Sequence, residues 1–149
     1  MNAAREFHTS TLLGDGRVLI TGGDDGNEAL ATAELFDPET GKFSSAGNMQ
    51  HARELHTATM RDDGTVLIIG GNALISGVGD GGHAGLVEES TPTAELFDPS
   101  NGSFHPAGEM SNPRAKHTGT LLPDGSVIVF GGTLSGNRTF FLSSAELFQ

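Results

Sequence analysis

The chain has 149 residues, with 8 basic and 19 acidic side chains and a formal net charge of −11. This negative charge excludes an electrostatic grip on phosphate backbones or anionic lipid, so we expect neither nucleic acid nor a membrane as a partner. The absence of Cys excludes disulfides, thiolate metal ligands and Cys nucleophiles. Neither an export signal nor a run of roughly 18 apolar residues is found, and the compartment stays open.

One segment recurs three times along the chain. It reads HTSTLLGDGRVLITGG at 8–23, HTATMRDDGTVLIIGG at 56–71 and HTGTLLPDGSVIVFGG at 117–132, and an AELF segment follows each copy. Such self-similarity is typical of repeat architectures, in which each unit is one supersecondary element that cannot bury its faces alone. The sequence therefore predicts a stack of similar units.

The first half of each unit predicts a β-hairpin. Small residues cluster in a first strand that starts at the HT pair, and an Asp-Gly pair follows at 15–16, 63–64 and 124–125. We expect a two-residue turn there, with both central residues at positive φ. The second strand, VLIT, VLII or VIVF, is apolar without alternation, so we expect neighbouring units to cover both of its faces.

The second half of each unit predicts two more strands. AELFDP at 33–38 and 94–99 indicates a third strand that ends at Pro, and a fourth strand is expected around Phe43 and Phe104. Four antiparallel strands make a propeller blade. We therefore expect an all-β propeller segment of eleven strands in one domain, with blades at about 5–49, 53–110 and 114–149, the last blade lacking its fourth strand.

These residues resemble the kelch-repeat β-propeller family. The paired glycines after an apolar strand, the preceding Arg-x-x-His and two aromatic residues with six others between them are similar to the kelch motif, although Phe36, Phe43, Phe97 and Phe104 stand where kelch repeats usually have Tyr and Trp. The chain most resembles bacterial kelch proteins related to the propeller of the galactose oxidase group. The resemblance implies loops that bind protein or carbohydrate, while a minority of such propellers are enzymes.

Two enzyme chemistries come with this resemblance. The copper radical oxidases need Tyr ligands and a Tyr crosslinked to Cys, and a chain with no Tyr and no Cys excludes that chemistry. An epimerase of the sialic acid type needs an acid and a base in a sugar pocket. His and Glu are present for this role, but no nonrepeated pair singles itself out. We expect no catalytic residue, no metal and no cofactor, with the epimerase type as the enzyme alternative.

The Arg-x-x-His segment supplies the first candidate binding residues. One interpretation is a ring of guanidinium and imidazole groups near the channel mouth, which binds an anion, a sugar or a metal. The other is structural, with each Arg paired to a Glu of a neighbouring blade's AEL segment, Glu34, Glu95 or Glu146. A residue present in every blade is more simply explained by the second. The candidates are Arg5, His8, Arg53, His56, Arg114 and His117.

The loops after the paired glycines differ most between units. They cover 24–32, 72–93 and 133–144, and strand direction places them on the same face as the Arg-x-x-His linkers. Long loops on a rigid scaffold commonly carry recognition. We expect the 72–93 loop, with Asp80 and His83 as candidate ligand contacts, to form part of a binding face; the alternative is a tolerated insertion.

Three blades fall short of the roughly four to eight that close a propeller. Uncovered apolar faces on the outer blades would promote aggregation of a monomer. We therefore expect a noncatalytic binding or assembly module, a half propeller that forms a six-bladed homodimer. The alternatives are the carbohydrate-active enzyme and a piece of a longer propeller protein that has no activity of its own.

Overall fold

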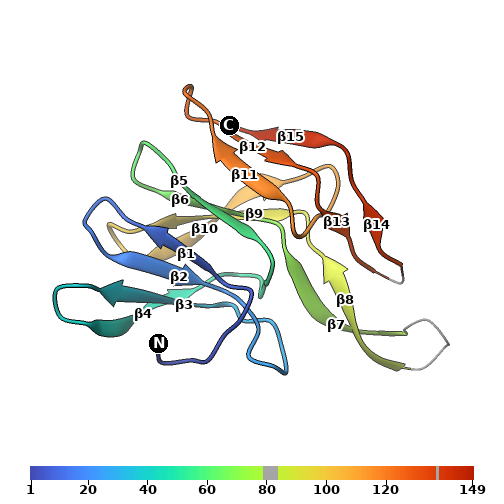
Figure 1. The fold of residues 1–149 in the computed structure, drawn as a ribbon, viewed down its shortest axis with the longest axis horizontal. Coiled ribbons are helices and arrows are strands. Elements are labelled where there is room, and N and C mark those ends of the chain that lie inside the picture. The colour runs from blue at the N-terminus through green and yellow to red at the C-terminus, as the bar shows by residue number, and fades with distance from the viewer. Residues whose placement is uncertain (79–83, 137) are drawn as a thin grey trace.

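The computed structural model describes residues 1–78, 84–136 and 138–149 (Figure 1). Over these ranges the protein consists of strands and connecting turns, with no helix. None of the described residues therefore forms a helix long and apolar enough to cross a membrane.

Three antiparallel sheets follow one another along the chain. The first contains β1 (Thr9–Leu12), β2 (Val18–Thr21), β3 (Thr32–Asp37) and β4 (Lys42–Asn48) in that order. The second contains β5 (Thr57–Met60), β6 (Val66–Ile69), β9 (Thr93–Asp98) and β10 (Ser103–Glu109). The third has three strands, β11 (Thr118–Leu121), β12 (Val127–Phe130) and β15 (Ala145–Phe148). These are blades 1, 2 and 3, and the predicted propeller segment with a last blade one strand short is confirmed.

The hairpins between the first two strands of each blade differ from the predicted turn. Leu13 pairs with Arg17 through its N–H, and the Gly16 N–H donates to the Leu13 carbonyl, so the loop has three residues, 14–16. Of these three residues only Gly16 has positive φ, 87°, and the same arrangement recurs at 62–64 and 123–125. The predicted two-residue turn was wrong because a type I turn followed by a left-handed Gly also accommodates Asp-Gly.

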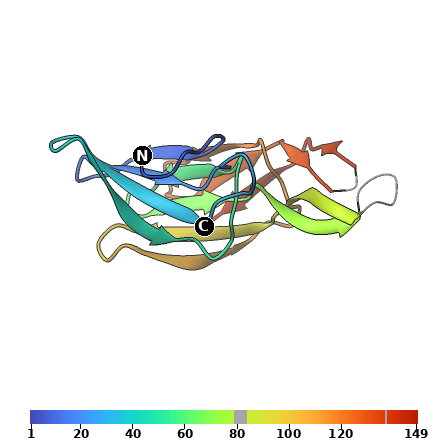
Figure 2. The ribbon, with the colours of Figure 1, turned by 90° about the horizontal axis from the view of Figure 1, so that it is seen from below.

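The longest predicted loop is largely a β-hairpin. Residues 72–93 contain β7 (Asn72–Val78) and β8 (Ala84–Ser90), which pair from Asn72 with Ser90 to Val78 with Ala84. Blade 3 has a shorter counterpart, β13 (Thr133–Leu134) with β14 (Phe140–Phe141). Strand pairing satisfies the backbone groups of a long excursion away from the blade. These four strands raise the expected eleven to fifteen within the described ranges. Both hairpins project from the same end of the molecule (Figure 2).

The blades pack face to face through their apolar strands. Between blades 1 and 2, Leu19 and Leu35 meet Val66, Ile68 and Phe97. Between blades 2 and 3 the other side of β6 is used, where Leu67 and Ile69 meet Val127 and Val129. All four residues of β6 are buried, which confirms that this strand is covered on both faces.

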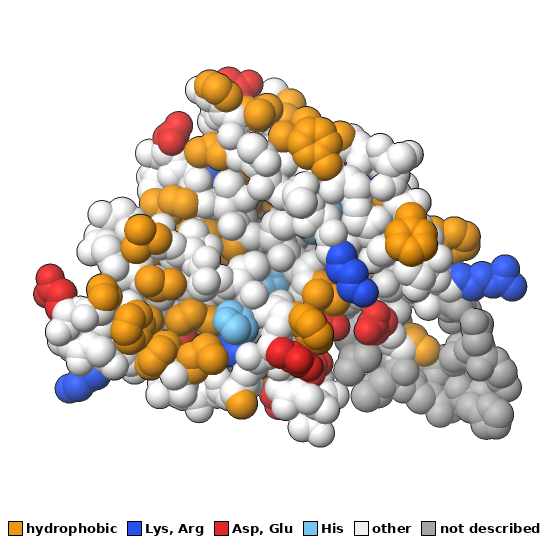
Figure 3. Space-filling model, viewed as in Figure 1, with side chains coloured by type: hydrophobic (Ala, Val, Ile, Leu, Met, Phe, Trp, Pro, Cys, Tyr) orange, Lys and Arg blue, Asp and Glu red, His pale blue; other side chains and the backbone are white. Residues whose placement is uncertain are grey.

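The outer faces of blades 1 and 3 lack such cover among the described residues. We define the blade 1 end face as Leu12, Val18, Ile20, Phe36 and Phe43, and the blade 3 end face as Thr118, Ile128, Phe130 and Leu147. Leu12 is 66% exposed, Phe130 48% and Leu147 50%. Hydrophobic side chains accordingly gather over blade 1 and again over blade 3 on the molecular surface (Figure 3).

Cover on both faces predicts a sharp contrast between two equivalent positions. Ile69, fully buried in β6, and Phe130, half exposed in β12, occupy the same place in successive repeats. We expect Ile69→Asp to lower the free energy of unfolding by about 4 kcal/mol or more, because it buries an unpaired charge. We expect Phe130→Asp to retain cooperative urea unfolding. Equal loss of stability in the two variants, followed by circular dichroism, would contradict the packing described here.

Candidate functional site

Each repeated Arg side chain joins the second and third strands of its own blade. Arg53 Nη1 donates at 2.7 Å to the carbonyl of Gly70, which follows β6, and at 2.9 Å to the carbonyl of Thr93, which begins β9. Its Nη2 donates to the Thr93 hydroxyl and to Glu95, both within 2.9 Å. Arg5 and Arg114 make the same set of bonds in blades 1 and 3. One Arg thus joins two strands of each blade.

The Glu partners fix the linkers that lead into the blades. The Glu95 carboxylate accepts the backbone N–H groups of Gln50 at 2.7 Å and His51 at 3.1 Å, in addition to Arg53. Glu34 and Glu146 accept the equivalent N–H groups at 2–3 and 111–112. The predicted Arg–Glu pairing is therefore present, but each Glu belongs to the blade that its Arg enters and not to a neighbouring blade, because the linker folds back onto its own third strand.

The three ion pairs are buried, apart from partial exposure of Glu146, whose side chain is 16% exposed. The side chains of Arg5, Arg53 and Arg114 are all 0% exposed. Burial raises the pKa of Glu34, but hydrogen bonds from the Asn2 backbone and the Arg5 side chain outweigh it, so that the pKa lies below its usual value. Glu146 shows the same balance, with Ser111 and Arg114 as donors. Both carboxylates therefore stay ionised beside their Arg partners.

The repeated His side chains act between blades. His56 of blade 2 places Nε2 3.0 Å from Thr9 Oγ1 and 3.2 Å from Thr21 Oγ1 of blade 1. His117 of blade 3 likewise lies 3.0 Å from Thr57 Oγ1 of blade 2. The paired glycines make room for this approach, since a Cβ at Gly22 would overlap the Arg53 carbonyl oxygen and lie 2.8 Å from the His56 ring. The imidazoles are therefore part of the blade contacts.

Burial keeps these two imidazoles uncharged. It lowers the pKa of His56 to about 3, with the Arg53 charge adding to the effect. Burial and Arg114 lower the pKa of His117 to about 4. At neutral pH neither ring carries the positive charge that the expected anion site would use. The binding role of the six Arg and His residues stays a prediction, and the contacts found here are to the protein itself.

The repeat and the fold are similar to those of known proteins. Residues 8–50 match the family model of the Kelch motif. These residues therefore carry a kelch motif. Among solved structures, a fungal alcohol oxidase of the AA5 family, in complex with copper, has a TM-score of 0.71, with 21% sequence identity over 93% of this chain. The chain spans 31% of that protein, and at this identity the likeness shows the kelch-type fold alone. No curated protein matches the sequence.

The blades carry their variable hairpins on the side where the linkers enter. Glu54 of the second linker bridges Asn72 of β7, and a hollow of about 520 Å³ lies at the base of this hairpin. The hollow is lined by both the linker and the hairpin, including Gln50, His51, Ala73, Glu89, Pro92 and Pro113. The candidate contacts Asp80 and His83 lie outside the described residues.

A buried acidic group in the second linker was not found from the sequence. Glu54 is 6% exposed, and its pKa is raised by burial and by the nearby carboxylates of Asp24, Glu88 and Glu6. Asn72 Nδ2 donates to Glu88 at 3.1 Å. No set of three or more His, Asp or Glu side chains in the described part of the chain could hold a metal ion. The signal was hidden because these residues come from two linkers and two connections far apart in the sequence.

The buried Arg–Glu pairs predict unequal costs for two similar substitutions. Glu95→Gln should lower the free energy of unfolding by about 3 kcal/mol, because it leaves the Arg53 cation buried without its countercharge. Asp15→Asn removes the charge of a solvent-exposed pair with Arg17 and should cost less than about 1 kcal/mol. Urea unfolding of both variants at one concentration checks this, and a cost below 1 kcal/mol for Glu95→Gln would contradict a structural role for the pair.

The neutral imidazoles predict a loss of stability in mild acid. The unfolded chain protonates its His side chains near pH 6.5, whereas the folded His56 does so near pH 3, so stability present above pH 6.5 is lost as the pH falls towards 3. Between pH 6.5 and 5, His56 should contribute a loss of about 2 kcal/mol. Urea unfolding should therefore depend less on pH in His56→Gln than in the wild type, and His105→Gln, on an exposed side chain, serves as control.

Proposed function

We propose that this kelch segment is a noncatalytic binding and assembly module, and that a second copy of the chain completes its propeller. The observation that carries the proposal is the contrast between faces of the same repeat. Blade 2 is covered on both sides. Val18 and Phe36 of blade 1 are half-buried and Phe130 of blade 3 is 48% exposed, at positions that are fully buried in blade 2 as Val66, Phe97 and Ile69. Exposed patches of this kind in soluble proteins commonly mark interaction surfaces.

The noncatalytic part of the proposal is supported by the use made of the polar groups. The Arg side chains donate hydrogen bonds to carbonyls of their own blades and to their Glu partners. Two of the three repeated His rings bond to threonines of the adjacent blade. The chain lacks the Tyr and Cys of copper radical chemistry. An epimerase of the sialic acid type needs an acid and a base in a sugar pocket, and no such pair lies in an enclosed pocket among the described residues.

Ligand binding is proposed at the hairpin end of the propeller. The β7–β8 and β13–β14 hairpins extend in the same direction (Figure 2). The hollow at the base of the first hairpin is lined by the linker as well as the hairpin. Such a surface, built from prolines, amides and carboxylates on a rigid scaffold, suits a protein segment or a carbohydrate. The Glu89 carboxylate in the lining of the hollow disfavours anionic ligands.

Solution mass tests the assembly. Light scattering after size-exclusion chromatography, over a range of concentrations, should give twice the 15.4 kDa of one chain. Phe130→Asp should shift the species to one chain, because it charges the blade 3 end face, and Asn27→Asp, which adds the same charge on an exposed loop, should not. A monomer at every concentration would contradict self-association and favour a piece of a longer propeller.

A further inference from the structure

The two blade interfaces share one set of hydrogen bonds. Between blades 1 and 2, the Gly23 N–H donates to the Arg53 carbonyl at 2.9 Å, and the Leu55 N–H donates to the Phe7 carbonyl at 3.0 Å. With the His56–Thr9 contact this makes three bonds, two through backbone groups and one through side chains. They are independent of the apolar packing and specify how far one blade is shifted along the next.

The same three bonds recur between blades 2 and 3. The Gly71 N–H donates to the Arg114 carbonyl at 2.9 Å, and the Lys116 N–H donates to the Leu55 carbonyl at 2.9 Å. The third bond joins His117 to Thr57 at 3.0 Å. Since the bonding partners come from equivalent repeat positions, the contact is a property of the repeat, and each blade has one set of groups for the preceding blade and another for the following blade.

Each end face has the donors and acceptors of one side of this contact. On blade 1 these are the Arg5 carbonyl, the Phe7 N–H and His8 Nε2, none of which has a hydrogen-bond partner among the residues that the structure describes. On blade 3 they are the Gly132 N–H, the Lys116 carbonyl and Thr118 Oγ1, again without partners within the described ranges. Each free donor on one end corresponds to a free acceptor on the other, and His8 corresponds to Thr118.

The free backbone groups are already in the conformation that the internal interfaces use. Phe7, Leu55 and Lys116 have φ values of 53°, 55° and 57°, a left-handed conformation that is uncommon outside glycine. Leu55 makes both bonds, one to each neighbouring blade. Because Phe7 and Lys116 share its conformation, their free N–H and carbonyl need no backbone rearrangement to bond in the same way.

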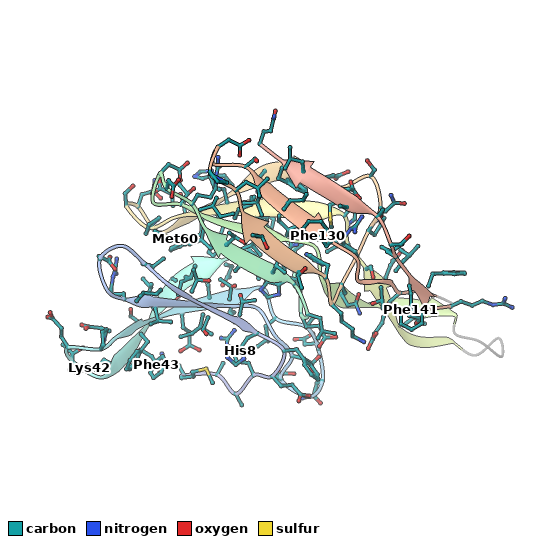
Figure 4. The ribbon with its side chains drawn as sticks, turned by 45° about the horizontal axis from the view of Figure 1, so that its top comes forward. His8, Lys42, Phe43, Met60, Phe130 and Phe141 are labelled. Carbon is teal, nitrogen blue, oxygen red and sulfur yellow. The ribbon has the colours of Figure 1, made fainter. Side chains whose placement is uncertain are left out.

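One methionine in each linker marks the same repeat register. Met49 and Met110 are 4% and 5% exposed where they close over the first glycine of the preceding blade, Gly22 and Gly70. Met1 has the same place before Arg5, yet it is 51% exposed. His8 and Phe43 lie on blade 1, and Phe130 lies on blade 3 at the other end of the row of blades (Figure 4).

We infer that the second copy docks head to tail, with its blade 1 end face against the blade 3 end face of the first copy, in the register of the internal interfaces. The inference rests on the proposed function and specifies its contact. The interface consists of Gly132 N–H to the Arg5 carbonyl, Phe7 N–H to the Lys116 carbonyl, and His8 to Thr118. The contact formed twice closes a ring of six blades, within the range that propellers use, and leaves no end face uncovered.

An engineered disulfide tests this register. A Cβ built on Gly119 of blade 3 lies 3.4 Å from Thr57 Cβ of blade 2, close to the Cβ separation of a disulfide. Gly119→Cys with Thr57→Cys is therefore the internal control and should form a bond within one chain. The equivalent positions on the end faces are Ser10 and Thr118. Since the protein has no Cys of its own, any crosslink between chains comes from the introduced residues.

The expected result has three parts. Ser10→Cys chains mixed with Thr118→Cys chains should give a covalent dimer on mild oxidation, at a rate at least tenfold above that of either variant alone. The double variant Ser10→Cys with Thr118→Cys should give a dimer held by two disulfides. Phe130→Asp added to the double variant should remove the crosslink between chains, whereas Asn27→Asp should not.

Two outcomes would overturn the inference and are distinct from failure of the proposed function. If light scattering gives a dimer and the control disulfide forms, but mixed Ser10→Cys and Thr118→Cys chains do not crosslink, self-association stands and the head-to-tail register is wrong. A ladder of trimers and longer species from the double variant would overturn the closed ring. If the chains are monomeric and uncrosslinked, the register and the self-association are both wrong.

Discussion

The fold depends on the need of each blade for protein on both of its faces. The second strand of every repeat is apolar on both sides, and a single antiparallel sheet cannot bury two apolar faces against itself. Blade 2 meets this requirement with β6, in which all four residues are buried. The burial gradient from blade 2 to the outer blades follows from this one constraint, and it directs attention to the ends of the row of blades as much as to the loops.

Some polar groups stabilise a single blade, and others form the contacts between blades. Arg and Glu act within a blade, where they fasten the incoming linker to the ends of two strands. His and the small residues of the first strand act between blades, where they set the register. The two tasks meet in the linker, because the segment that Glu95 holds also carries the Arg53 carbonyl and the His56 ring that contact blade 1.

Much of this architecture could be predicted from the sequence, because the repeat states the same pattern three times. Strand order, the Pro that ends the third strand and the two-sided burial of β6 follow from local patterns in apolar and turn residues. The hairpin formed by β7 and β8 was missed, since Gly-rich segments with few charges carry little strand signal on their own. The grouping of Glu54 with Asp24 and Glu88 was also missed, because it depends on linkers and connections that meet only after the blades have stacked.

The position of the neutral imidazoles determines which contacts are weakened at low pH. His56 and His117 lie between blades, so protonation weakens the coupling between units and leaves the hydrogen-bonded ladders inside each unit unchanged. In a chain of units coupled only to nearest neighbours, cooperativity resides in those couplings. Acidification therefore weakens the cooperativity between blades, and a broader thermal transition reports the change.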